Sequence, residues 1–287
     1  MKNNISMFLK KYCIWVLLIV STVVSLCLWI FCSKILDFSS LFLNFFVSFS
    51  TSIITVAIIN IIIDNKRKQE LLPIKKSLYI EVAFFLNRLI DMWEGMYAQS
   101  IIDREEISVK TLFTEDVINK IYICLDLEGY PPIIPQDNWF NYLFNQSVEL
   151  KKIGEKILDR YVMISDANLF YNIHYIVNNS VIAGGFFIKM KQIRLLDQSK
   201  GIPRIPWLKS YCPEPIEKEY KAFKKLYDWC NLNYKLLEKY DGVNAIKEKI
   251  FILNKHTPPT SVMSSEKIIS KNQESQEWSK KHSSLDV

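Results

Sequence analysis

The sequence predicts an all-α membrane protein, with a two-helix N-terminal transmembrane hairpin, a cytosolic helical bundle and a disordered C-terminal tail. Three observations predict this fold class. Two uncharged apolar runs lie close together near the N-terminus. Over most of the chain that follows, apolar residues recur three and four positions apart, which is the period of an amphipathic helix. Residues 256–287 are rich in Ser, Lys, Glu and Gln and contain one aromatic residue, Trp278.

The two uncharged runs cover residues 12–33 and residues 38–63. At a rise of 1.5 Å per residue, the first run spans roughly 30 Å, which is the thickness of a hydrocarbon core. The second run is long enough to cross with some tilt. Residues 34–37 between them form a short exoplasmic turn. The first run exceeds the apolar length of a cleaved signal peptide and lacks an A-x-A-like cleavage site, so we interpret it as a retained anchor.

Basic residues flank the pair of runs and set its expected orientation. The positive-inside rule places such flanks in the cytosol. Residues 1–11 and the domain after the second run are therefore expected on the cytosolic side of a bacterial plasma (inner) membrane, with both termini cytosolic. The basic residues that carry this prediction are Lys10, Lys11, Lys66, Arg67, Lys68, Lys75 and Lys76.

Small hydroxyl residues recur at helical spacing inside both runs, and such residues let membrane helices approach closely. They are Ser21 and Ser25 in the first run, and Ser48, Ser52 and Thr55 in the second. Two interpretations stay open. The residues pack the hairpin together, or they support self-association into an oligomer or pore.

Residues 64–255 form one cytosolic helical domain by length and pattern. Pro73 is expected to kink or restart the helix that leaves the membrane. The apolar residues of 74–98 cover most of a helix circumference, which predicts a helix at the centre of a bundle. Further helices are expected after the N-cap residues Thr114, Asn138 and Asp166, over 216–237, and over a short segment from Val243 to Leu253.

Two segments of this domain carry more specific expectations. Residues 216–237 repeat apolar and aromatic residues over three heptads. Their aromatic character favours docking onto the bundle over a free coiled coil. Residues 199–215 form a loop with four prolines, in which Trp207 and Tyr211 are expected to fold back as a cover. Residues 256–287 cannot bury enough apolar surface to fold alone, which predicts a disordered tail.

The weak candidates for a ligand-binding site are Glu81, Arg88 and His174. Glu81 and Arg88 fall on the narrow polar seam of residues 74–98, where an exposed stripe with an Arg88–Asp91 pair is the favoured interpretation. His174 lies among aromatic residues, which favours a buried, hydrogen-bonded histidine. No zinc motif, P-loop, dinucleotide fingerprint or nucleophile elbow occurs in the sequence. We therefore predict no catalytic residue, no metal ligand and no cofactor, and an enzyme is the less favoured class.

The net charge of +6 is concentrated beside the apolar runs, so lipid headgroups are the expected partner and nucleic acid is not. The sequence predicts a membrane-anchored domain that binds a partner or ligand, or self-associates, as a sensor, scaffold or effector. The layout resembles that of membrane effectors in bacterial anti-phage systems, in which a cytosolic sensor drives spans to oligomerise. No motif extends that resemblance to a family. A pore-forming effector or toxin and a membrane-associated enzyme remain the alternatives.

Overall fold

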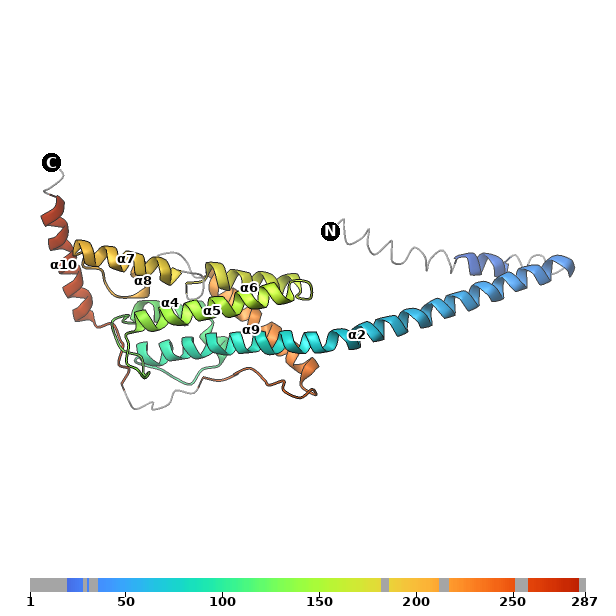
Figure 1. The fold of residues 1–287 in the computed structure, drawn as a ribbon, viewed down its shortest axis with the longest axis horizontal. Helices are drawn as coiled ribbons and strands as arrows, with labels where there is room; N and C mark the ends of the chain where they lie inside the picture. Colours follow the sequence, from blue (N-terminus) through green and yellow to red (C-terminus); the bar gives the residue numbers. More distant parts are fainter. Residues whose placement is uncertain are drawn as a thin grey trace. The chain divides into compact units, whose positions relative to one another are not determined.

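The computed structural model describes residues 20–27, 30, 36–181, 186–211, 217–250 and 258–283. Within these ranges the regular structure is helical and contains no strand, which confirms the all-α class (Figure 1). Three isolated antiparallel bridges join segments between the helices. The chain divides into two compact units, residues 1–74 and residues 75–287.

Helix α2 runs from Leu36 to Ser100 and contributes residues to both units. Its most apolar stretch of 18 residues has a mean hydropathy of 2.2, and none of that stretch is buried. Among the described residues, α2 is the one helix long and apolar enough to cross a membrane. Residues 20–27 are also helical, but most of the predicted span 12–33 lies outside the described residues. The two-helix hairpin is therefore not confirmed.

Helix α2 continues through Pro73 without a break. The expectation that the helix restarts there was wrong, and the predicted segments 38–63 and 74–98 belong to one helix. Proline removes one backbone hydrogen bond and crowds the carbonyl four residues earlier. That carbonyl belongs to Gln69, in a stretch that is exposed on every side, so water can satisfy it.

The second half of α2 forms the centre of the core in residues 75–287, as its sequence predicts. Its side chains are buried around almost the whole circumference, and three rings, those of Tyr79, Phe85 and Trp93, have no exposed surface. Trp93 stacks on Tyr122 of α4 (Glu115–Cys124) with ring centroids 6.2 Å apart, and it meets Phe223 of α9 (Glu217–Leu237) edge-on at 5.9 Å. Aromatic pairs in this range of distances add to the free energy of simple burial.

The remaining helices surround or extend this core (Figure 1). They are α3 (Val109–Leu112), α4 (Glu115–Cys124), α5 (Trp139–Tyr161), α6 (Ala167–Asn179), α7 (Phe186–Lys200), α8 (Leu208–Tyr211), α9 (Glu217–Leu237) and α10 (Ser265–Ser283). The predicted N-caps are confirmed. The side-chain oxygens of Asn138 and Asp166 accept hydrogen bonds from backbone N–H groups three residues later, at 2.9 and 2.8 Å. Thr114 occupies the N-cap of α4, but its hydroxyl donates to the Thr111 carbonyl at 2.8 Å and does not cap the helix.

Helix α9 docks onto the bundle, as predicted for residues 216–237. Phe223 and Cys230 are completely buried, and Tyr227 and Leu237 are nearly so. The helix packs along α6, and Phe223 also contacts Phe113 with ring centroids 5.1 Å apart. An aromatic seam therefore lies inside the protein's own core.

Residues 243–250 are extended, so the short helix predicted from Val243 was wrong in the described part of that segment. Backbone N–H groups of this segment bond to residues elsewhere in the chain, and these bonds compete with helix formation. Lys247 N donates to Asn87 Oδ1 at 3.2 Å, and Ile250 N donates to the Ile107 carbonyl at 2.9 Å. Val243, Ile246 and Ile250 are still buried. Their spacing correctly predicted burial, and external hydrogen bonds decided the conformation.

The prediction of a disordered tail was wrong for residues 258–283. Met263 N donates to the Cys124 carbonyl at 2.7 Å, and the Ser261 carbonyl accepts from Asp126 N at 2.9 Å. Ser261 is 1% exposed and Met263 is 7% exposed. A polar segment needs little apolar burial when the folded body supplies backbone hydrogen bonds, and composition alone does not reveal such an acceptor surface. Helix α10 follows directly from this anchored segment.

The α5–α6 crossing gives a test of the packing. Gly154 of α5 faces the buried Val177 of α6, and a Cβ at Gly154 would overlap Val177 Cγ2. Val177 is β-branched and has one strongly preferred rotamer in a helix, so it cannot move aside cheaply. We expect Gly154→Ala to destabilise the bundle by about 1–3 kcal/mol, although alanine is the better helix former. Unfolding of the full chain in detergent, followed by tryptophan fluorescence, measures this loss.

Gly95→Ala is the matched control. A Cβ at Gly95 would lie 3.6 Å from Trp139 Cη2, which is an ordinary contact. We expect this variant to be as stable as the wild type or more stable by up to about 1 kcal/mol. Equal losses in the two variants would contradict the described crossing.

Candidate functional site

Glu81 and Arg88 tie α2 to α5 and do not form a binding site. Arg88 donates to Glu149 at 2.7 Å and to Gln146 at 3.0 Å, and Glu81 accepts from Arg160 at 3.0 Å. The expected Arg88–Asp91 pair was wrong in the described chain: Arg88 pairs with Glu149, and Asp91 pairs with Lys247. These pairs are partly exposed, so each stabilises the bundle by at most about 1 kcal/mol.

His174 is exposed on α6, so the expectation of a buried histidine was wrong. Its ring stacks on Phe170 with centroids 6.1 Å apart. The buried face of α6 is formed by Ile173, Ile176 and Val177, and His174 points away from it. The structure therefore does not bring His174 together with Glu81 and Arg88.

The roles expected for the membrane-flanking basic residues and for the hairpin-packing hydroxyls stay predictions. Lys66, Arg67 and Lys68 are exposed on α2, whereas Lys10 and Lys11 lie outside the described residues. Three hydroxyls of the second run bond to their own helix. Thr51, Ser52 and Thr55 each donate to the carbonyl four residues earlier, at 2.7–2.8 Å. Ser48 supplies one of these carbonyls.

Ser25 is 8% exposed and Ser21 is half-buried in the helical residues 20–27, whereas Ser48, Ser52 and Thr55 are exposed. The hydroxyls of Thr51, Ser52 and Thr55 are therefore satisfied without a neighbouring helix. Their role in hairpin packing stays a prediction.

A buried acid lies in the core where α9 meets α4 and the end of α6. Glu219 is 2% exposed, and its Oε2 accepts from Tyr122 OH and from Val181 N, both at 3.3 Å. Its Oε1 accepts no hydrogen bond in the described part of the chain. Burial raises the pKa of Glu219 to about 7, and the two hydrogen bonds oppose that rise only in part. The carboxyl therefore titrates near neutral pH.

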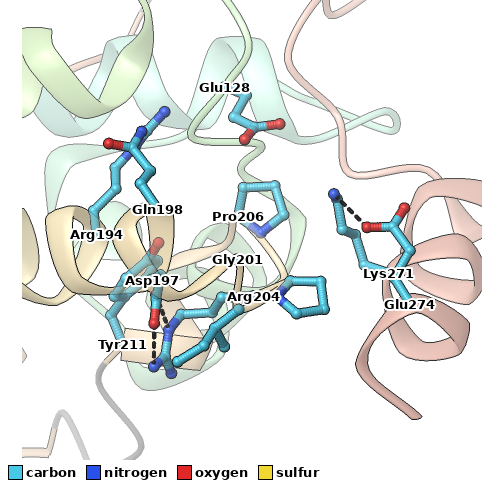
Figure 2. Close-up of a pocket in the computed structure, with 12 residues that line it drawn as sticks. Glu128, Arg194, Asp197, Gln198, Gly201, Arg204, Pro206, Tyr211, Lys271 and Glu274 are labelled. Atoms are coloured by element: carbon cyan, nitrogen blue, oxygen red, sulfur yellow. Dashed lines mark hydrogen bonds and ion pairs between the residues drawn. The ribbon is translucent and has the colours of Figure 1, made fainter. Parts of the chain in front are cut away.

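The clearest candidate for a binding site is a cavity of about 280 Å³ beside α7 (Figure 2). Its lining combines the end of α7, the following loop, α8, Glu128 and one face of α10. The charged residues that line it are Glu128, Arg194, Asp197, Arg204, Lys271 and Glu274. Two other hollows, of about 590 and 570 Å³, lie between α6 and α9 and at the α5–α6 turn, but neither gathers as many charges.

An ion pair fixes one wall of the cavity. Arg204 Nε donates to Asp197 Oδ2 at 2.7 Å and its Nη2 donates to Oδ1 at 3.2 Å, so the contact is bidentate. The guanidinium lies 5.3 Å from the ring centroid of Tyr211. Asp197 is 6% exposed, and α7 ends in a turn at Gly201 with φ of +64°. Glycine adopts this conformation without strain, which lets the loop return along α7.

Helix α10 closes another side of the cavity. Lys267, at its start, lies 2.7 Å from Asp126 Oδ2 and 3.0 Å from Glu128 Oε2. Further along, Trp278 Nε1 donates to the Lys200 carbonyl at 3.2 Å. The Lys267 contacts hold α10 to the segment after α4, and the Trp278 contact holds it to the end of α7. The helix is otherwise polar, so it contributes charge to the cavity more than apolar burial.

The lining residues give the cavity charged walls of both signs. They include neither histidine nor cysteine, and their carboxylates face cationic partners. In the described ranges no three His, Cys, Asp or Glu side chains form a group that could hold a metal ion. The site was missed at the sequence level because α10 was taken for disordered tail. The one available signal was the proline-rich loop, and Tyr211 does fold back there.

No protein-family model matches the chain, and no curated protein or solved structure is significantly similar to it.

The buried Glu219 predicts a pH-dependent stability. Because its pKa rises from 4.5 to about 7 on folding, the folded state binds the proton more tightly than the unfolded state. The folded state therefore loses stability as pH rises from about 4.5, and the loss levels off above about 7. We expect Glu219→Gln, which cannot ionise, to exceed the wild type at pH 8 by on the order of 3 kcal/mol, with no excess near pH 4.5.

Thermal unfolding of the full chain in detergent at several pH values measures this difference. Glu238→Gln, an exposed position at the end of the same helix, is the control and is expected to show no such pH-dependent gain. A Glu219→Gln curve that runs parallel to the wild type at all pH values would contradict the buried acid.

Proposed function

We propose that this protein is a membrane-anchored sensor or effector whose cytosolic helical bundle binds a ligand or partner. The proposal rests on one observation: α2 has an exposed apolar half and a buried half. One helix supplies both an unburied apolar stretch and the most buried side chains of the bundle. A change in the bundle would then act on the membrane segment through a continuous helix.

The apolar stretch supports a membrane location. Ile54, Ile58 and Ile62 of this stretch expose 51–59% of their surface. Removing one large apolar side chain from water is worth about 1.5–3 kcal/mol, so lipid is the favourable environment for this surface. Lys66, Arg67 and Lys68 follow immediately and are exposed, which favours a cytosolic position for the end of the stretch.

The bundle supports a binding role better than a catalytic or pore-forming one. The cavity beside α7 has charged walls, and each of its carboxylates is held in an ion pair with a cation. The hydroxyls of Thr51, Ser52 and Thr55 donate to their own helix, so these three do not require a polar pore. Binding at the membrane surface is the function that uses both halves of α2.

Fractionation of cells that express the full chain tests the anchor and its orientation. The chain carries a C-terminal fluorescent reporter that matures in the cytosol but not after export. We expect a fluorescent protein that stays in the membrane pellet after a carbonate wash. Recovery in the washed supernatant, or a dark but exported reporter, would contradict the proposal.

Two lysines in the middle of the apolar stretch should abolish this behaviour. Each charge at the centre of a membrane helix costs about 2.5–3.5 kcal/mol, so the double variant Ile54→Lys/Ile58→Lys disfavours crossing. We expect it to lose cytosolic fluorescence from the washed pellet, either by release or by inverted topology. Leu71→Lys, also exposed on α2 but beyond the basic residues, should behave as the wild type. An unchanged double variant would show that α2 does not cross.

A further inference from the structure

The acidic residues of the cavity beside α7 are each paired with a cation. Each lies within 3.0 Å of its partner. The pairs are Asp197 with Arg204, Glu128 with Lys267, and Glu274 with Lys271. The acids therefore leave no unmatched negative charge in the cavity, and an added cation or a metal ion would have to break an existing pair.

Arg194 is the exception among the charged lining residues. No carboxylate partner is recorded for it anywhere in the described chain, and its guanidinium lies 4.6 Å from the ring centroid of Phe140 on α5. Stacking on a ring uses the face of the guanidinium and leaves its N–H edge available. An arginine edge in a cavity is well suited to a carboxylate or phosphate, which it can bind through two parallel hydrogen bonds.

Lys271 provides a second cation from the other side. Figure 2 shows Arg194 and Lys271 on opposite sides of Pro206, one on α7 and the other on α10. Lys271 lies 2.8 Å from Glu274, three residues along its own helix, and both side chains are partly exposed. A surface pair of this kind is weak, so Lys271 can turn to an anion at low cost.

We propose that this cavity binds a small organic anion, carrying one carboxylate or phosphate group, between Arg194 and Lys271. The inference names a ligand class for the binding role proposed above and rests on it. The volume of about 280 Å³ suits a metabolite, and no peptide or nucleic acid fits inside it. Because the two cations belong to α7 and α10, the bound anion fastens the C-terminal helix to the bundle.

The test uses the full chain in detergent, with sodium phosphate and sodium acetate as probes and sodium chloride of equal ionic strength as the reference. Two properties are measured: the midpoint of thermal unfolding and the rate of tryptic cleavage after Lys280 in α10. At about ten times its dissociation constant, a probe should raise the midpoint by about 3 °C and slow cleavage severalfold.

Arg194→Gln and Lys271→Gln should lose both effects. Lys189→Gln, exposed on α7 and outside the cavity lining, should keep them. Excluded salts such as phosphate stabilise proteins in general, so the difference between the wild type and Arg194→Gln is decisive. Lys271→Gln changes an α10 side chain outside the buried core, so it keeps the test valid if Arg194→Gln does not fold.

A response to phosphate alone would identify a phosphate ester as the ligand class, and a response to acetate alone would identify a carboxylate. Responses that survive in both cavity variants, or the absence of any response beyond chloride, would overturn the proposal. Neither result depends on where the protein fractionates in cells, so failure of this site is separable from failure of the membrane anchor.

Discussion

The structure depends on the burial of the second half of α2. Between Leu78 and Tyr97 the side chains are apolar around most of the helix, and eight of them have no exposed surface. A helix of this kind cannot lie on a surface, because each large side chain returned to water would cost about 1.5–3 kcal/mol. Other segments must enclose it. Helices α4, α5 and α9 and the extended residues 243–250 do so, and their own amphipathic patterns follow from that task.

The polar contacts around this core fall into two groups. Some join helices to one another, and others line the cavity beside α7. Arg88 and Glu81 join α2 to α5 near the surface, and Lys247 pairs with Glu94 and Asp91 to hold the extended segment on α2. These pairs connect elements that the apolar core already brings together. The charges beside α7 differ, because they line a cavity and leave Arg194 without an acidic partner in the described chain. A cation in a cavity without an acidic partner points to a binding site, whereas a matched ion pair on the surface does not.

The sequence predicted those features that depend on local pattern. Asn138 and Asp166 began helices because a short polar side chain can cap the free N–H groups of a first turn. The buried seam of α9 followed from three- and four-residue spacing. Features that depend on distant partners were missed. The tail after residue 257 is ordered by Cys124 and Asp126, and His174 is exposed because the rotation of α6 is set by its neighbours. Pro73 lies in an exposed stretch, where water lowers the cost of the missing bond.

The central claim is that α2 is one helix in two environments, lipid over its apolar stretch and protein from Leu78 onward. Amide hydrogen exchange of the full chain in lipid nanodiscs tests this directly, because buried and lipid-covered amides exchange slowly. The account predicts slow exchange over 43–63 and over 78–97, with faster exchange in the exposed residues 64–74 between them. Rapid exchange over 43–63 in lipid would contradict it.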